Sequence, residues 1–147
     1  MATLQSQRNR RKTASFGTTN VAIIGAGRGG TALMEIFADD PLVRIVGVAE
    51  VDQQAPGVSL AKQLGIPVTR DYRQLLAMER VDLIIDVSGN AEVWQLLQDF
   101  HRMGVTIIGG ASAKFMWELI EARIRATAEI ERTLNKYQSL YRLYVKE

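Results

Sequence analysis

The chain has no cysteine, and it has only one histidine and three prolines among its 147 residues. The absence of cysteine excludes disulfide bonds, thiolate catalysis and cysteine-based metal sites, and a single histidine disfavours a histidine-rich metal site. No apolar run reaches the length of about 18 residues that a membrane span needs. The first twenty residues also lack the apolar segment of a secretory signal. We therefore expect a cytoplasmic protein that does not enter a membrane.

Positive charge is concentrated at the start of the chain. Arg8, Arg10, Arg11 and Lys12 lie in a segment rich in Gln, Ser, Thr and Asn, and the first twenty residues contain no acid. Because the whole chain carries +2, the remainder carries −2. This composition predicts a disordered basic tail over residues 1–19. Contact with nucleic-acid phosphates is an alternative role, but we favour a solvated tail, since short basic arms are common.

Short apolar runs alternate with helical segments after the tail. The runs are Val21–Ile24, Arg44–Glu50, Ile66–Thr69, Val81–Val87 and Gly104–Ile108. Continuous apolar runs of this length are typical of strands covered on both faces, and their alternation with helices predicts a parallel sheet with right-handed crossovers. With 47% apolar residues the chain can form one real core. We predict an α/β fold over residues 20–112, a three-layer doubly wound parallel sheet of the Rossmann type.

The first apolar run leads into a glycine-rich turn. Gly25, Gly27 and Gly30 have the spacing Gly-x-Gly-x-x-Gly. In a dinucleotide-binding turn the first glycine permits the tight turn, the second lets the backbone approach a pyrophosphate, and the third lets the helix pack close to the strand. The helix N-terminus then offers N–H groups to the phosphates. The alternative is that these glycines serve only the turn and the packing.

Two carboxylates follow the second predicted strand. Glu50 lies twenty residues after Gly30, where an acid can accept hydrogen bonds from an adenosine ribose. Asp52 lies beside it, and no lysine or arginine follows before Lys62. Two acids would repel a 2′-phosphate, so NAD(H) is favoured over NADP(H). The alternative for Asp52 is a simple role in the turn.

A small polar turn, Ser88-Gly89-Asn90, follows the strand at Val81–Val87. Ligands of open α/β sheets bind at the carboxyl ends of the strands, so this turn should face the same crevice as the glycine-rich turn. Ser88 and Asn90 are therefore candidates for bonds to a ribose or a phosphate. Equally, Asn90 could cap the helix that we predict over residues 91–103.

We expect the apolar residues of this helix in the core rather than in a stacking platform; they are Val93, Trp94, Leu96, Leu97 and Phe100. His101, near the predicted C-terminus, fits the negative end of the helix dipole better than the role of a catalytic base. After the last strand, Gly109 and Gly110 allow a close approach of a ligand. Alternatively they form an ordinary turn in which Ser112 caps the next helix.

Residues 113–147 contain no glycine or proline and predict one long helix or two abutting ones. We expect Trp117, Ile120 and Ile124 to pack against the sheet. Further along, a stripe recurs at steps of three or four residues, made of Thr127, Ile130, Leu134, Tyr137, Tyr141 and Tyr144. A stripe of near-heptad period favours pairing with another helix, as in a homodimer. The alternative is that the helix folds back over the edge of its own sheet.

From Asn20 to about Trp117 the chain resembles the NAD-binding half of the Gfo/Idh/MocA oxidoreductases and of homoserine- and aspartate-dehydrogenase-like proteins. The resemblance rests on Val21–Gly30, Val46–Asp52, Gly65–Tyr72, Val81–Val87 and Gly104–Ile108. It implies a nicotinamide cofactor on the glycine-rich turn, with the ribose at Glu50. Our candidate cofactor-binding residues are Gly25, Gly27, Arg28, Gly29, Gly30, Glu50, Asp52, Ser88 and Asn90. We expect no metal site and assign no catalytic residue.

The sequence departs from the Gfo/Idh/MocA pattern at the end of the fifth strand. In that family this strand runs into Glu-Lys-Pro, whose lysine serves catalysis. Here it runs into Gly109-Gly-Ala-Ser-Ala-Lys114, and Lys114 has neither the glutamate before it nor the proline after it. The relatives then carry a large substrate domain, whereas only a helix follows in this sequence.

The long C-terminal helix resembles the signalling helices that join sensory domains to output modules in bacterial regulators. We therefore favour an NAD(H)-binding sensory or regulatory module that dimerises through this helix and acts on an output domain or partner protein. A second hypothesis is the cofactor half of an NAD-dependent oxidoreductase, completed by a partner chain or belonging to a longer protein. The third is a ligand-free structural interaction domain.

Overall fold

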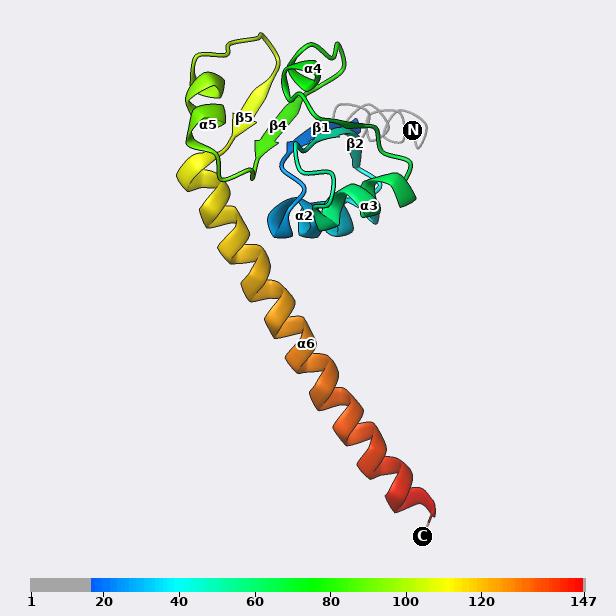
Figure 1. Cartoon of the computed structure of the whole chain (residues 1–147). Helices are drawn as coiled ribbons and strands as arrows, with labels where there is room; N and C mark the ends of the chain where they lie inside the picture. Colours follow the sequence, from blue (N-terminus) through cyan, green and yellow to red (C-terminus); the bar gives the residue numbers. More distant parts are fainter. Residues whose placement is uncertain (1–16, 147) are drawn as a thin grey trace, which may run out of the picture. The chain divides into compact units, whose positions relative to one another are not determined.

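The computed structural model describes residues 17–146, which form two compact units, one ending at Ala113 and one beginning at Lys114. Figure 1 follows the elements along the chain by colour. The basic residues of the predicted tail lie outside the described residues. Within residues 17–146, no helix combines the length and the apolar character that crossing a membrane requires.

Five parallel strands form one sheet in the order β3-β2-β1-β4-β5. They are β1 (Thr19–Ile24), β2 (Val43–Ala49), β3 (Val68–Thr69), β4 (Leu83–Asp86) and β5 (Thr106–Ile108). The apolar run of β1 lies at the centre of the sheet, and Val21, Ala22, Ile23 and Ile24 are at most 3% exposed. The prediction of an α/β doubly wound parallel sheet is confirmed.

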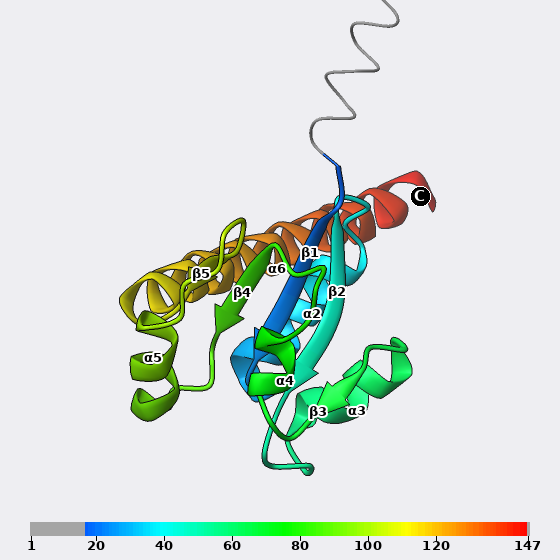
Figure 2. The same cartoon turned by 90° about the horizontal axis from the view of Figure 1, so that it is seen from above.

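Two helices pack on each face of this sheet. They are α2 (Arg28–Ala38) and α3 (Pro56–Gln63) on one face, and α4 (Arg73–Leu76) and α5 (Ala91–Gln98) on the other. Figure 2 shows α2 and α4 on opposite sides of β1. Because side chains alternate along a strand, Ala22 and Ile24 join Leu75 of α4 and Leu97 of α5 in one buried cluster, while Ile23 faces the other side.

Helix α5 is shorter than the prediction of 91–103, because it ends at Gln98. The guanidinium of Arg102 donates hydrogen bonds to the carbonyl oxygens of Leu76 (3.2 Å), Met78 (2.6 Å) and Glu79 (3.2 Å). Phe100 packs against the core cluster. These long-range contacts draw the chain out of the helix after Asp99. His101 consequently lies exposed in a loop, and its predicted place at a helix C-terminus is wrong.

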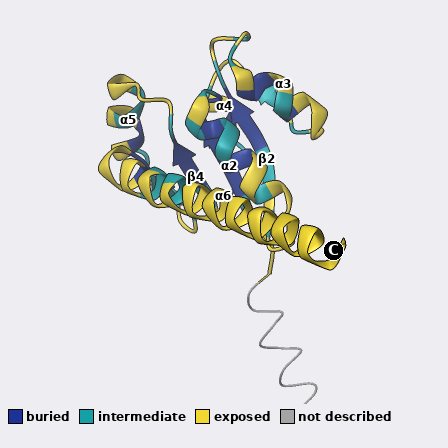
Figure 3. Cartoon of the chain, turned by 90° about the horizontal axis from the view of Figure 1, so that it is seen from below, coloured by how far each residue is buried: buried dark blue, intermediate teal, exposed yellow. Residues whose placement is uncertain are grey.

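Helix α6 (Gly110–Lys146) is continuous over 37 residues, which confirms the long C-terminal helix. It begins at Gly110, so Ser112 lies inside the first turn and does not cap the helix. Figure 3 shows how the exposed class dominates along this helix, and every described residue from Ala122 onward is exposed. The packing of Trp117, Ile120 and Ile124 against the sheet stays a prediction.

Candidate functional site

The turn after β1 presses against the turn after β4 at the centre of the sheet. Gly25 has φ +106°, a left-handed conformation that L side chains rarely adopt. A Cβ at this position would lie 2.8 Å from the backbone nitrogen of Ser88 and 2.9 Å from the carbonyl carbon of Val87. In open α/β sheets, ligands bind at such a crevice outside the carboxyl ends of the strands.

The other glycines of this turn have different surroundings. A Cβ on Gly30 would collide with the carbonyl oxygen of Gly25, so Gly30 allows α2 to lie against the turn. A Cβ on Gly29 would make ordinary contact, 3.4 Å from the Cβ of Val87. Gly27, at the N-cap of α2, has no atom within 4 Å of the place where its Cβ would be. Open space therefore lies in front of Gly27.

Glu50 lies directly after β2 and turns its carboxylate toward this turn. The backbone N–H of Ala26 donates to Oε1 at 3.0 Å, and the N–H of Asp52 donates to Oε2 at 3.3 Å. The side-chain amide of Gln53 donates to the carbonyl oxygen of Glu50 at 2.7 Å. The carboxylate is thus fixed one residue away from the open space at Gly27.

Asp52 does not share this position. Its Oδ1 accepts a hydrogen bond from the N–H of Gln54 at 2.9 Å, and its side chain is exposed. This is the geometry of an Asx turn, in which the carboxylate stabilises its own loop. The structure therefore gives Asp52 the turn role that the sequence left as an alternative.

Ser88 and Asn90 are held by the end of β4 and the start of α5. The hydroxyl of Ser88 donates to Oδ1 of Asp86 at 2.6 Å, and the N–H of Ser88 donates to the same oxygen at 3.0 Å. Asp86 is a buried carboxylate, 5% exposed. Oδ1 of Asn90 accepts from the N–H groups of Glu92 (2.9 Å) and Val93 (3.3 Å), so Asn90 caps α5.

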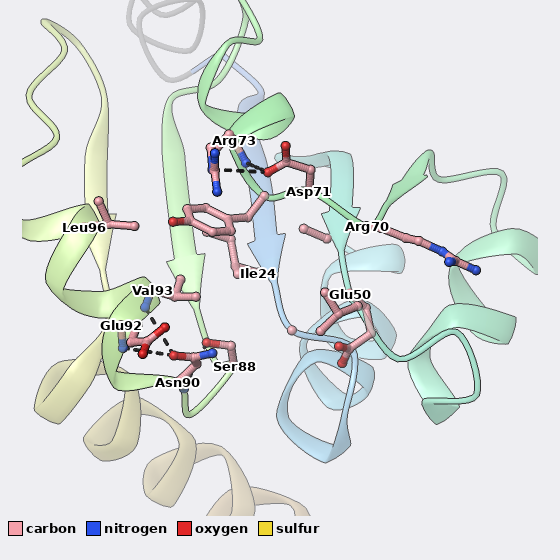
Figure 4. A pocket seen from close by; sticks show the side chains of 14 residues that line it. Ile24, Glu50, Arg70, Asp71, Arg73, Ser88, Asn90, Glu92, Val93 and Leu96 are labelled. Atoms are coloured by element: carbon pink, nitrogen blue, oxygen red, sulfur yellow. Dashed lines mark hydrogen bonds and ion pairs between the residues drawn. The ribbon is translucent and has the colours of Figure 1, made fainter.

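A cleft of about 460 Å³ lies at the carboxyl ends of β1, β2 and β4. Figure 4 shows Glu50 on one side of it and Ser88, Asn90 and Glu92 on the other. Of the nine candidate residues, the cleft brings together Gly25, Glu50, Ser88 and Asn90. The remaining five are not in its wall; Gly27, Arg28, Gly29 and Gly30 lie at the N-terminus of α2, and Asp52 lies in the exposed turn.

The segment after β3, including the first residue of α4, contributes residues that sequence reasoning missed. Arg70, Asp71, Tyr72 and Arg73 all line the cleft. The Nε of Arg73 lies 3.6 Å from Oδ1 of Asp71, and its guanidinium lies 6.0 Å from the centre of the Tyr72 ring. The signal was available, because this segment follows β3 as Glu50 follows β2, and carboxyl ends of parallel strands meet at one edge.

The second glycine pair does not leave room for a ligand. At Gly109 a Cβ would collide with the indole ring of Trp94, and at Gly110 it would lie 2.9 Å from Nε1 of the same ring. The interpretation that these glycines allow a close ligand approach is therefore wrong, because Trp94 of α5 already occupies that space. A bulky side chain from a neighbouring helix, rather than a ligand, explains the two missing side chains.

Leu96 also departs from prediction, since it is 56% exposed and lines the cleft, whereas Leu97 on the same helix is buried in the core. His101 does not line the cleft. Lys114 is exposed on α6. Within residues 17–146 no group of three or more metal-ligating side chains is close enough to hold a metal ion.

The strand order, the glycine-rich turn and the acid after β2 define a domain of the Rossmann class. Within that class, the family model described as dihydrodipicolinate reductase, N-terminus, matches residues 19–130. The match spans well over half of the chain, and the chain therefore belongs to this family. A comparison with curated protein sequences finds no match.

Solved structures with the same fold include several dehydrogenases. A myo-inositol dehydrogenase from Corynebacterium glutamicum ATCC 13032 has a TM-score of 0.55 and 22% identity, over 63% of this chain and 27% of that one. The Lactobacillus casei myo-inositol dehydrogenase, solved with NAD(H) and myo-inositol, has a TM-score of 0.53 and 22% identity, over 63% and 28%. An NAD-binding protein from Listeria innocua has a TM-score of 0.51 and 18% identity, over 74% and 33%.

At these identities the likeness concerns the fold, and it confirms the resemblance to the cofactor half of the Gfo/Idh/MocA enzymes at that level. The aligned part is about a quarter to a third of each of these structures.

Proposed function

We propose that the chain is an NAD(H)-binding module with a regulatory role and without a complete catalytic site of its own. Cofactor binding is supported by the positions of Gly27 and Glu50, which lie next to each other at the N-terminus of α2. The space in front of Gly27 is open at the N-terminus of α2, and the carboxylate of Glu50 is fixed to the neighbouring residue Ala26. A helix N-terminus favours phosphate, and a carboxylate accepts hydrogen bonds from ribose hydroxyls.

The hydrogen bonds of Glu50 leave it able to hold a ribose. Each carboxylate oxygen can accept about two hydrogen bonds, and Oε1 and Oε2 each have one backbone donor, from Ala26 and Asp52. A diol could therefore donate to Glu50 while the bond to Ala26 persists. A bound nicotinamide would supply hydride-transfer chemistry, while the chain's own residues would bind and orient it.

The preference for NAD(H) rests on charge at the ribose end of the cleft. The carboxylate of Glu50 would repel a 2′-phosphate. Arg70 and Arg73 line the same cleft and could offset this repulsion. Arg73 is already paired with Asp71 and lies over Tyr72, and Figure 4 shows the side chain of Arg70 directed away from Glu50. We therefore expect the repulsion by Glu50 to dominate.

The regulatory part is supported by the two contacts that α5 makes. One side of α5 lines the cleft through its N-cap Asn90 and through Val93 and Leu96. Trp94 of the same helix packs on Gly109 and Gly110, where α6 begins. A ligand that shifts α5 would therefore also shift the first turn of α6. This requires that the ligand binds the shifted and the unshifted arrangement of α5 with different affinity.

A second candidate function is the cofactor half of an NAD-dependent oxidoreductase. It is favoured by the match to a reductase family. Against independent catalysis stands the sequence after β5, where Gly109-Gly110 leads to Lys114 without Glu-Lys-Pro. A ligand-free structural domain is the third candidate, and the structural hydrogen bonds of Asp52 and Asn90 favour it.

The test is calorimetric titration of the chain with NAD⁺, NADH, NADP⁺ and NADPH. We expect NAD(H) to bind more tightly than NADP(H). Glu50→Gln should weaken NAD(H) binding roughly tenfold, because a charge-assisted hydrogen bond is lost. It should also reduce the difference in affinity between NAD(H) and NADP(H), because the negative charge that repels the 2′-phosphate is removed. Glu35→Gln, on an exposed position of α2, is the matched control and should change nothing. Absence of binding for all four nucleotides at millimolar concentration would leave the ligand-free domain.

Amide hydrogen exchange tests the proposed regulatory role separately from nucleotide binding. NADH should change the exchange of amides 110–113, at the start of α6, in the wild type. If NADH binds but leaves the exchange of these amides unchanged, the proposed regulatory role is wrong. The second candidate, the cofactor half of an NAD-dependent oxidoreductase, then stands.

A further inference from the structure

Helix α6 carries a stripe of exposed, mostly apolar side chains along its second half. We call it the α6 seam, and it consists of Thr127, Ile130, Leu134, Tyr137, Tyr141 and Tyr144. Its members are exposed, with Ile130 at 60%, Leu134 at 54%, Tyr137 at 65%, Tyr141 at 69% and Tyr144 at 80%. Exposed apolar surface that is contiguous over several turns marks an interaction site.

The spacing of the seam identifies the kind of partner. Successive members are separated by three, four, three, four and three residues, which is a repeat of 3.5 residues and not the 3.6 of a straight helix. A stripe of this period stays on one line only when the helix winds around another helix with a left-handed twist. A sheet or a flat surface gives no reason for such a strict heptad.

The charges of α6 do not oppose pairing with a second copy of the same helix. Between residues 127 and 145 the seam itself is uncharged, and the charged side chains lie off it at Glu129, Glu131, Arg132, Lys136 and Arg142. We propose that the α6 seam pairs with the α6 seam of a second copy of this chain, parallel and in register. The inference is independent of nucleotide binding, so each can fail alone.

Parallel pairing brings specific flanking residues together. In a parallel coiled coil, each residue that flanks the seam on one side faces the residue five positions later on the other helix. Here these pairs are Ala126 with Glu131, Thr133 with Gln138, and Leu140 with Val145. None places like charges opposite each other, and the last pair, 52% and 61% exposed, extends the apolar contact.

The area available is sufficient for a stable dimer. A tyrosine buries roughly 150–250 Å² when it is fully covered, so the six seam tyrosines of two copies can remove on the order of 600 to 1,000 Å² from water at their exposed fractions. Ile130, Leu134, Leu140 and Val145 add to this area. The total exceeds the value of about 1,000 Å² that a biological interface should bury.

The first test is sedimentation equilibrium of the full chain at micromolar concentrations, with and without NADH. We expect twice the chain mass of 16.4 kDa. Leu134→Lys should raise the dimer dissociation constant by roughly a hundredfold or more. Asn135→Lys is the matched control, because it places the same charge on the adjacent exposed position off the seam, and it should leave the mass unchanged.

The second test fixes the orientation. The chain has no cysteine, so a single introduced cysteine reports only its own neighbours. Tyr137→Cys should form a disulfide-linked dimer under mild oxidation, since in a parallel in-register pair the two copies of residue 137 face each other at disulfide distance. Ser139→Cys, on the outer side of the helix, should not.

Three results would overturn the proposal. A monomer at all concentrations would mean that something else covers the seam, including the chain's own first unit. A dimer that survives Leu134→Lys would use another surface. A dimer in which Tyr137→Cys does not cross-link faster than Ser139→Cys would not be parallel and in register.

Discussion

Two turns at the carboxyl edge of the same sheet contain glycines, yet the space that these glycines leave is used differently. After β1, the space in front of Gly27 is open. After β5, the space at Gly109 and Gly110 is filled by the indole of Trp94. A glycine in a strand-to-helix turn therefore does not by itself indicate a ligand site. What replaces the Cβ depends on the neighbouring helix.

The same distinction divides the glycines of the first turn. At Gly25 a side chain would collide with the backbone of Ser88, and at Gly30 it would collide with the backbone of Gly25. Neither backbone segment can move aside. Gly27 has no such neighbour. We therefore expect substitutions at Gly25 and Gly30 to affect stability, and substitution at Gly27 to affect the proposed ligand binding.

The largest effect is expected at Gly30. Gly30→Ala should lower the free energy of unfolding by about 3 kcal/mol, because the new Cβ collides with a backbone carbonyl in a packed interior. Gly27→Ala should change it by less than about 1 kcal/mol. Urea unfolding followed by tryptophan fluorescence measures both. Equal stability of the two variants would show that Gly30 is no more important for packing than Gly27.

A smaller effect is expected at the turn after β5. Gly109→Ala should cost about 2 kcal/mol, because its Cβ meets a side-chain ring that can shift in part. In a Trp94→Ala background most of this penalty should disappear, since the ring that is struck is then absent. A double-mutant cycle by urea unfolding measures this coupling. Additive effects would show that Trp94 is not what fills the space.

The smallest effect is expected at Asn90, whose two possible roles lie at the cleft. Asn90→Ala should cost about 1 kcal/mol of stability through the lost cap on α5, with little change in NADH affinity. Asn90→Ser should restore most of the stability, because serine also caps helices. A large loss of affinity with unchanged stability would instead make Asn90 a ligand-binding residue.

Sequence predicts well whatever depends on short-range pattern. The buried runs of β1 and β4, the tight turn at Gly25 and the acid after β2 follow from periodicity and spacing, and the structure has them in these places. Because the carboxyl ends of parallel strands meet at one edge of the sheet, the positions of Glu50 and Ser88 after their strands predict one cleft, and the structure has both in its wall.

Sequence fails where long-range contacts decide. The end of α5 is set by Arg102 and its hydrogen bonds to the carbonyl oxygens of Leu76, at the end of α4, and of Met78 and Glu79 beyond it. The space beside Gly109 is filled by the ring of Trp94, and Leu96 is exposed because it lines the cleft. No local pattern encodes these contacts, since each depends on which elements the fold places side by side. Arg70 lies twenty residues after Glu50 in the sequence, and only the pairing of β2 with β3 brings both to the same cleft.

We propose that the open space at Gly27 receives a dinucleotide, and calorimetric titration with NADH is the measurement that decides this. The measurement compares the wild type with Gly27→Val and with Ala38→Val, which adds the same side chain at an exposed position of α2. We expect Gly27→Val to weaken NADH binding at least roughly tenfold and Ala38→Val to leave it unchanged. Absence of binding in the wild type, or equal binding in all three, would contradict this proposal.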